Sequence, residues 1–187
     1  MRIIAGKYKG RRLTSPKGMN VRPTSDRVKE SVFSIIQKHI VDANFLDLCS
    51  GTGNIGIEAL SRGAKQVTFL DRNPVSLKLL RQNLKICGIE LYDTQVKVIA
   101  KDLYKGIKTL QNQLETFELI YFDPPYDADI YNQCLTQISD TKLLNEAGIL
   151  LIEHHKKTIL PTEIGLLTHE EQRQYGDTCV SLFRSIE

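Results

Sequence analysis

The sequence repeats a short apolar segment that ends near an acidic residue and then continues into a helical segment. Four such strand–helix units are followed by a fifth strand, with strands near residues 44–49, 67–71, 95–100, 117–122 and 147–153 and helices near 55–62, 74–86, 103–114 and 128–140. Strands that alternate with helices pair in parallel, because each helix returns the chain across a face of the sheet. The sequence therefore predicts an α/β fold, a mostly parallel sheet with helices on both faces.

The two ends of the chain depart from this alternation. Residues 1–23 carry turn signals near two glycines and predict a small hairpin arm, and a helix is expected to start after Thr24 or Ser25. An apolar stripe at helical spacing indicates that this helix packs on the sheet; its members are Val28, Val32, Ile35, Ile36 and Ile40. Residues 166–184 predict an antiparallel hairpin that joins one edge of the sheet. We expect one domain over residues 1–187, with the arm at 1–23 and the core at 24–187.

A glycine-rich turn follows the first strand. Gly51, Gly53 and Gly56 match the G-x-G-x-x-G pattern of dinucleotide-binding folds, which keeps a nicotinamide-dependent oxidoreductase open as an alternative. However, Asp47 precedes the first glycine by four residues. A carboxylate there disfavours a pyrophosphate and favours an ammonium group. The oxidoreductase interpretation leaves Asp47 without a role.

Acidic residues also end the next two strands. Asp71, at the tip of the second strand, is placed to accept hydrogen bonds from the two ribose hydroxyls of a nucleoside. Asp102, after the third strand, could accept from an adenine amino group, although an aspartate in this position is often only a helix N-cap. With Asp47 and Asp123, four acids occupy equivalent positions, so we expect them to meet at one edge of the sheet.

The fourth strand ends at the tetrapeptide Asp123-Pro124-Pro125-Tyr126. Two prolines cannot continue a strand, because they lack the backbone N–H and their φ is fixed. The resulting stiff corner presents a carboxylate, backbone carbonyls and a tyrosine ring, which together suit a planar ring that carries an exocyclic amino group. The alternative is a plain strand-ending turn with a solvated Asp123.

These motifs resemble those of S-adenosylmethionine-dependent methyltransferases that alkylate exocyclic amines. The segments 1–13, 22–33 and 173–178 are further similar to the RsmD family, bacterial methyltransferases of guanine N2 in small-subunit ribosomal RNA. The resemblance runs from Met1 to Arg184. It implies a Rossmann-like class I fold with a seven-stranded sheet whose last strand is antiparallel. It also implies S-adenosylmethionine as the cofactor and guanine 966 of 16S rRNA, in the usual count, as the target.

The resemblance assigns roles to individual residues. Asp123 and the Pro124 carbonyl would accept the amine hydrogens, Pro125 would stiffen the corner, and Tyr126 would stack on the flipped-out base. No metal is required. The expected cofactor contacts come from the strand ends and the glycine-rich turn: Asp47, Ser50, Gly51, Thr52, Gly53, Asp71, Arg72, Asp102 and Leu103.

Charge is distributed unevenly along the chain. Residues 1–30 contain nine basic and two acidic side chains, a net charge of +7, whereas the remaining residues carry −4. A basic arm on a mildly acidic body is typical of a polyanion binder, although a solvated surface hairpin would also be basic. Tyr8 could stack on a base or pack on the hairpin. The residues expected to bind RNA are Arg2, Lys7, Lys9, Arg11, Arg12, Arg22 and Arg27. We expect the partner to be 16S rRNA within the small ribosomal subunit or its assembly intermediate, and a monomeric enzyme.

Several other classes are disfavoured. No apolar run approaches the roughly 20 residues that span a bilayer, and the basic N-terminus lacks a secretory apolar core, so we expect a cytoplasmic protein. His154 and His155 are adjacent on a strand and point to opposite faces, which argues against a shared metal and predicts one semi-buried and one exposed ring. The cysteines are scattered singly and are expected to be reduced and mostly buried: Cys49, Cys87, Cys134 and Cys179.

Besides guanine-N2 methylation and the oxidoreductase, three further functions remain open. A DNA adenine-N6 methyltransferase shares the Asp-Pro-Pro-Tyr corner but usually carries a separate target-recognition domain. Another RNA amino-methyltransferase would share the cofactor motifs as well as the corner. A non-catalytic RNA-binding module would need only the basic arm and would show no cofactor affinity.

Overall fold

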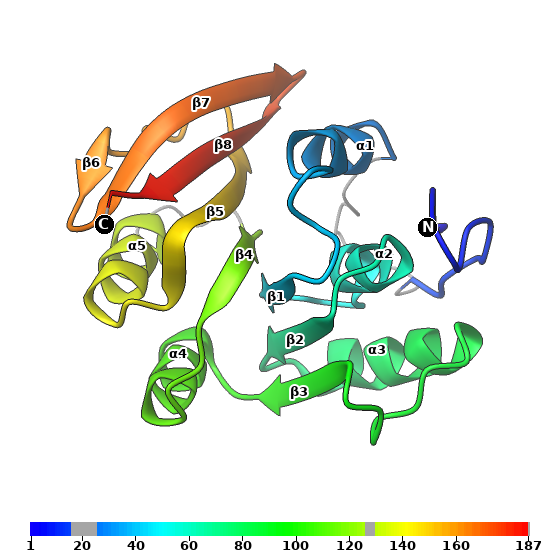
Figure 1. Ribbon diagram of the computed structural model, residues 1–187. Coiled ribbons are helices and arrows are strands. Elements are labelled where there is room, and N and C mark those ends of the chain that lie inside the picture. Colours follow the sequence, from blue (N-terminus) through cyan, green and yellow to red (C-terminus); the bar gives the residue numbers. More distant parts are fainter. Residues whose placement is uncertain (16–25, 126–129, 187) are drawn as a thin grey trace.

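A computed structural model describes residues 1–15, 26–125 and 130–186 (Figure 1). Strands and helices alternate through most of the chain, as the sequence predicts. The strands are β1 (Asn44–Leu48), β2 (Gln66–Asp71), β3 (Val96–Ala100), β4 (Phe117–Phe122), β5 (Leu144–His155), β6 (Glu163–Ile164), β7 (Leu167–Tyr175) and β8 (Thr178–Ser185). The helices are α1 (Asp26–Ile35), α2 (Asn54–Ser61), α3 (Pro74–Ile86), α4 (Leu103–Asn112) and α5 (Ile130–Asp140).

All of these strands form one sheet in the order β3-β2-β1-β4-β5-β8-β7-β6. The first five strands of the chain pair in parallel, and β8 lies antiparallel between β5 and β7. The prediction of seven strands was wrong by one, because the two-residue strand β6 pairs antiparallel with β7 at the far edge. Two residues are too few to give an alternating pattern that the sequence could reveal.

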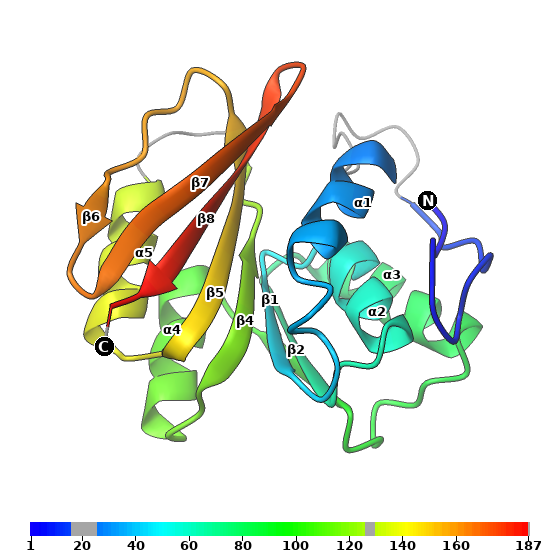
Figure 2. The same ribbon diagram turned by 45° about the horizontal axis from the view of Figure 1, so that its top comes forward.

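Helices cover both faces of the sheet (Figures 1 and 2). One apolar cluster joins α1, α2, α3 and the N-terminal arm to one face, and a second joins α4 and α5 to the other. The central strands β1, β2 and β4 are buried on both faces, which explains why they are largely continuous apolar runs rather than alternating ones.

Two element boundaries differ from the sequence prediction by more than two residues. Helix α1 ends at Ile35, although the apolar stripe continues to Ile40, because the chain turns at residues 37–39 to reach β1. Ile36 and Ile40 are nevertheless buried in the cluster of this face. Strand β5 starts at Leu144, three residues earlier than predicted, and is irregular around Ala147, whose φ is +57°. Thr24 and Ser25, the predicted helix caps, lie outside the described residues.

The described part of the arm, residues 1–15, is a short hairpin fixed to α2. The Ile3 N–H donates to the Arg11 carbonyl at 3.0 Å, which closes the hairpin. The Ile4 and Ala5 N–H groups donate to the Glu58 carboxylate of α2 at 2.8 and 3.0 Å. Because its backbone is hydrogen-bonded to a buried side chain, this part of the arm is a fixed surface of the core rather than a loose tail.

Candidate functional site at the carboxyl edge of the sheet

Three strand ends meet in one row at the carboxyl edge. Leu48 of β1 pairs with Leu70 of β2 and with Phe122 of β4. The next residues along these chains are therefore level with one another: Cys49 in the centre, flanked by Asp71 and Asp123. Neighbouring strands lie about 4.8 Å apart, so the two carboxylates stand one strand to either side of the cysteine.

The Cys49 thiol lies among these acids. Its pKa is raised to about 12, chiefly by burial and then by the nearby carboxylates of Asp71, Asp123 and Asp47, while Arg72 acts in the opposite direction. We expected a small core residue here, but Cys49 is half-exposed and has a φ of +59°. A thiol held protonated is a poor nucleophile, so the site is built on carboxylates rather than on a cysteine.

Asp47 is buried at the end of β1, only 2% exposed. Its Oδ2 accepts a hydrogen bond from the Gly56 N–H of α2 at 2.9 Å. Burial raises its pKa to about 7, the Gly56 hydrogen bond acts against this, and Asp71 adds to it. No ion pair involves Asp47 in the part of the chain that the structure describes. A buried carboxylate without a cation is an acceptor for a positively charged ligand.

The glycine-rich turn runs close over this edge. The Gly51 N–H donates to the Asp71 Oδ2 at 2.7 Å, with φ +54°, and a Cβ on Gly51 would meet only the Cys49 carbonyl oxygen, 4.0 Å away. Space above Gly51 is therefore open. Gly53 and Gly56 are instead required for packing. A Cβ on Gly53 would lie 2.3 Å from the Leu80 side chain, and a Cβ on Gly56 would lie 2.3 Å from a phenylalanine ring of β2. Gly56 therefore lets α2 pack tightly on the sheet.

Two polar residues of the turn are also buried. The Ser50 hydroxyl is without a hydrogen-bond partner among the described residues. Thr52 contacts the arm, since its hydroxyl lies 3.8 Å from the Met1 sulfur, and its carbonyl accepts from the Asn83 side-chain amide at 2.9 Å. Asn83 also exchanges two hydrogen bonds with the Thr14 backbone. The arm, α3 and the turn are thus joined through one buried amide.

The third strand contributes Asp102, the N-cap of α4. Its Oδ1 accepts from the Lys105 N–H at 3.1 Å, and its Oδ2 lies 3.5 Å from the Lys105 Nζ. The hydrogen bond from the Lys105 N–H lowers the Asp102 pKa. Asp102 therefore caps α4, which is the alternative role that its position after a strand suggested. Its contact with the adenine amino group stays a prediction. Leu103 is buried beside it at the start of α4, while Arg72 is exposed after β2.

The corner after β4 is described as far as Pro125. Asp123 is half-buried, Pro124 is buried and Pro125 is exposed. Asp123 is not free, because it has an interaction with another group of the protein. Tyr126, the predicted stacking residue, lies outside the described residues. The structure therefore brings Asp123 and Pro124 level with the glycine-rich turn and leaves the tyrosine untested.

The predicted RNA-binding cations surround the arm but differ in their freedom. Lys9 and Arg12 are exposed. Lys7 and Arg11 lie over the buried Tyr8 ring, at 5.3 and 5.7 Å from its centroid, so Tyr8 packs on the arm rather than offering a face to a base. Arg2 is paired with Asp26 at 3.1 Å, and the Arg27 guanidinium lies 5.9 Å from the centroid of the Tyr175 ring. Arg22, the last predicted cation, lies outside the described residues.

Sequence reasoning missed a buried charge cluster next to the site. The Glu58 and Lys29 side chains are fully buried and lie 3.4 Å apart, and Arg62 reaches Glu58 at 2.8 Å. The Lys29 Nζ also donates to the Asn54 side chain at 2.9 Å and to the Arg2 carbonyl at 2.5 Å. A glutamate inside the apolar helix 54–61 was the available signal, because an unpaired charge is rarely buried.

The histidines do not form a site. His154 is fully buried, its Nε2 lies 2.9 Å from the Ser181 hydroxyl, and burial lowers its pKa. His155 is half-buried, so the pair is one step more buried than predicted. Among the described residues no cluster of three or more potential metal ligands is present, and none of their helices has the length and apolarity of a membrane span.

The site fits a nucleoside with a charged amino-acid tail. An orphaned Ser50 hydroxyl, a buried Asp47 without a cation and open space above Gly51 lie around one turn. Both Asp71 oxygens already accept a backbone N–H, from Gly51 and Asn73, and each keeps a second lone pair for a ribose hydroxyl. With the parallel sheet and its antiparallel β8, these features define a Rossmann-like class I methyltransferase, and its cofactor is S-adenosylmethionine.

Comparison with known proteins specifies the class further. The model of the family described as Conserved hypothetical protein 95 matches residues 1–184, and the chain belongs to this family, the RsmD family of rRNA methyltransferases. Ribosomal RNA small subunit methyltransferase D of Haemophilus influenzae is 33% identical over 162 residues, covering 87% of this chain and 82% of that one. The protein of the same name from Escherichia coli strain K12 is 29% identical over 184 residues, covering 98% and 89%.

Solved structures agree with the fold over nearly the whole chain. A hypothetical protein from Thermus thermophilus superposes with a TM-score of 0.83 at 25% identity, covering 97% of this chain and 98% of that one. The arm and the C-terminal hairpin therefore lie within the shared structure rather than outside it.

Proposed function

We propose that this protein transfers a methyl group from S-adenosylmethionine to the exocyclic N2 amine of a guanine in small-subunit ribosomal RNA, at guanine 966 of the usual count. The observation that carries the proposal is the row at the carboxyl edge. Asp123 stands level with Asp71 and the glycine-rich turn, so an amine at the corner and a nucleoside cofactor at the turn would face each other. The names of the relatives support ribosomal RNA as the substrate.

The corner supplies what a weak nucleophile needs. The lone pair of guanine N2 is delocalised into the ring, and two acceptors on its hydrogens draw the nitrogen toward tetrahedral geometry. In our proposal these acceptors are the Asp123 carboxylate and the Pro124 carbonyl, while Pro125 stiffens the turn and Tyr126 stacks on the base. Asp123 also stabilises the positive charge that develops on the nitrogen.

The cofactor supplies an electrophilic methyl group on a sulfonium. The protein contributes position: Asp47 accepts the cofactor ammonium, Ser50 and the Gly51–Gly53 turn line the methionine end, and Asp71 holds the ribose. Arg72, Asp102 and Leu103 complete the adenine end. With the amine held by Asp123 and Pro124 and the cofactor held by the turn, the two reactants would lie close together, and the Asp123 carboxylate would stabilise the nitrogen as it gains positive charge.

We further propose that residues 1–187 act as a single catalytic domain and as a monomer. The arm contributes phosphate contacts, and the substrate is 16S rRNA within the small ribosomal subunit or its assembly intermediate, which would place the activity in the cytoplasm. Support comes from the arm itself, which is hydrogen-bonded to Glu58 of the core and presents Lys9 and Arg12 to solvent.

The test is transfer of label from S-adenosylmethionine to small ribosomal subunits that lack the modification, with free ribosomal RNA and duplex DNA as parallel substrates. We expect label in the RNA of the subunits, recovered as N2-methylguanosine. Label recovered as N6-methyladenine in DNA would replace the proposal by the adenine alternative. Cofactor binding without label in any of the three substrates would refute the proposed target.

A further inference from the structure

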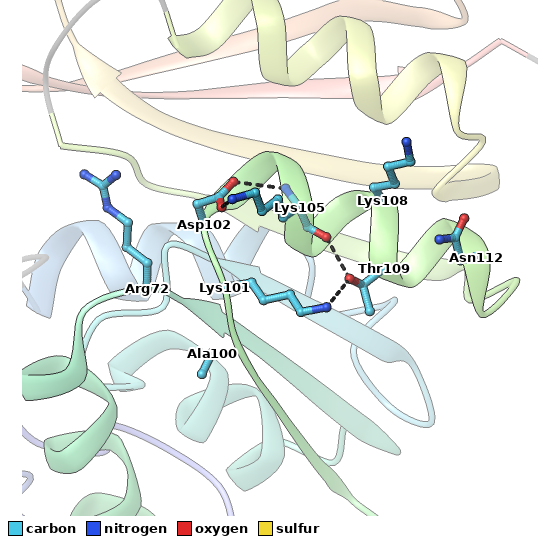
Figure 3. A pocket seen from close by; sticks show the side chains of 8 residues that line it. All are labelled: Arg72, Ala100, Lys101, Asp102, Lys105, Lys108, Thr109 and Asn112. Atoms are coloured by element: carbon cyan, nitrogen blue, oxygen red, sulfur yellow. Dashed lines mark hydrogen bonds and ion pairs between the residues drawn. The ribbon is translucent and has the colours of Figure 1, made fainter.

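A hollow of about 700 Å³ lies beside α4, on the side of the adenine end of the proposed cofactor site (Figure 3). Arg72 lines it from the end of β2, and Lys101, Lys105 and Lys108 line it from the start and outer face of α4. Asp102 is the acidic residue of its lining. Lys105 and Lys108 stand three residues apart on α4 and therefore share one face, while Lys101 precedes the helix and reaches alongside it to Thr109.

The charge of this hollow is unusual for its surroundings. Four cations face one carboxylate, although residues 31–187 as a whole carry a net charge of −4. Lys105 lies near Asp102, and Lys101 donates to the Thr109 hydroxyl at 2.8 Å, a neutral partner. Lys108 is exposed, and neither it nor Arg72 has a carboxylate partner in the described ranges. Unpaired cations around a concave surface attract anions.

The cofactor does not account for this charge. S-adenosylmethionine carries a sulfonium and an ammonium against a single carboxylate and contains no phosphate. A net positive molecule gains nothing from the three lysines, so this part of the hollow is suited to a different, anionic ligand.

The position of the hollow relative to the proposed active site suggests which anionic ligand it binds. The arm lies with α1, α2 and α3 on one face of the sheet, and α4 lies on the other face (Figure 2). The row with Asp71 and Asp123 stands at the sheet edge between these faces. An RNA strand whose guanine enters this edge continues in two directions from it. One flank can follow the arm, and the other passes α4.

We propose that the hollow beside α4 binds backbone phosphates of the substrate RNA through Lys101, Lys105 and Lys108, on the flank opposite the arm. This proposal rests on the proposed function and names a second contact surface for the same substrate. The two basic surfaces would hold the RNA on both sides of the target base. Phosphate contacts of this kind fix position and carry no sequence information.

The test variant is the double substitution Lys101→Gln and Lys108→Gln, which removes two charges without touching Arg72 or Asp102. The matched control is Lys38→Gln with Lys65→Gln. Both control lysines are exposed and stand shortly before β1 and β2, at the amino edge of the sheet, and the charge change is the same. Binding of each protein to small-subunit RNA is measured over a series of salt concentrations, with S-adenosylmethionine titrations alongside.

We expect the hollow variant to bind RNA about ten-fold more weakly at low salt and the slope of log K against log salt to fall by roughly 1.4 to 1.8, about 0.7 to 0.9 for each lost phosphate contact. Cofactor affinity should stay unchanged, and the control should match the wild type. Equal RNA affinity and slope for the hollow variant, with an active wild type, would overturn this proposal alone. A wild type that neither binds nor methylates this RNA would overturn it together with the proposed function.

ATP serves as a second probe, because a free nucleotide offers the same phosphate chemistry. Loss of ATP binding in the hollow variant with unchanged RNA binding would also overturn the proposal and assign the hollow to a nucleotide. Loss of RNA binding without measurable ATP binding would support it.

Discussion

Asp47 and Glu58 are both buried carboxylates beside α2, and they differ in what surrounds them. Glu58 has Lys29 at 3.4 Å, Arg62 at 2.8 Å and two backbone N–H donors from the arm. Asp47 has the Gly56 N–H, and its pKa is raised to about 7 by burial. A carboxylate whose charge is fully matched holds the structure together, whereas one that lacks a cation is ready for a charged ligand.

The contrast also separates the two tasks of α2. Its Gly56 N–H donates to Asp47 of the proposed cofactor site, and Glu58 and Ser61, further along the helix, hold the arm. The helix therefore links the surface that we assign to RNA with the turn that we assign to the cofactor.

The largest effect is expected at Glu58. Glu58→Ala leaves Lys29 buried without its carboxylate and two arm N–H groups without an acceptor, so the free energy of unfolding should fall by about 3–5 kcal/mol. Chemical denaturation measures this. Glu115→Ala is the control: its ion pair with Lys97 is partly exposed, so it should cost below about 1 kcal/mol. Similar small losses for both variants would remove the structural role that we give to Glu58.

Asp123 extends the comparison of Asp47 and Glu58 to a third carboxylate, which is half-buried and which we propose acts on the amine during methyl transfer. Asp123→Ala should lower kcat by roughly 10²–10³-fold, because the developing charge on the amine loses its acceptor. Cofactor affinity should change little, since Asp123 belongs to the amine side of the row. Steady-state kinetics with small subunits and a calorimetric titration of cofactor measure the two quantities. A variant that methylates at close to the wild-type rate would exclude Asp123 from the reaction.

Asp47 should respond in the opposite direction from Glu58. Its folded pKa lies above the unfolded value of 3.8, so its proton stabilises the fold at low pH, and this stability is lost as the pH rises through about 7. Asp47→Asn keeps an acceptor for the Gly56 N–H and removes the charge. At pH 8 the variant should therefore be more stable than the wild type, by up to about 4 kcal/mol, and at pH 4 nearly equal. Chemical denaturation of both proteins at pH 8 and pH 4 measures these differences in stability. A variant less stable than the wild type at pH 8 would contradict a raised pKa for Asp47.

Much of the fold could be predicted from the sequence, because strands buried on both faces leave continuous apolar runs that alternate with helical segments. The convergence of Asp47, Asp71 and Asp123 followed from the rule that parallel strands end at one edge, and the register confirms it. The short strand β6 was missed, since two residues carry no pattern.

The unpredicted parts depend on contacts between distant segments. The pairing of Glu58 with Lys29 joins residues 29 apart in the chain, and nothing local to either one indicates the partner. The same holds for Asn83, which connects Thr14 of the arm to Thr52 of the turn. The hollow beside α4 is different in part: Lys105 and Lys108 lie three residues apart in a segment predicted to be helical, whereas the position of Lys101 beside them depends on its contact with Thr109.

The most direct test of the claim that Asp47 is the counter-ion of the cofactor is a calorimetric titration of S-adenosylmethionine at pH 6. Wild type and Asp47→Asn are compared in two buffers with different ionisation enthalpies. At this pH Asp47 is mostly protonated in the free protein, and an incoming ammonium group favours its ionised form. We predict release of close to one proton by the wild type, none by the variant, and at least about ten-fold weaker binding by the variant. Equal affinity and equal proton release in the two proteins would contradict the account.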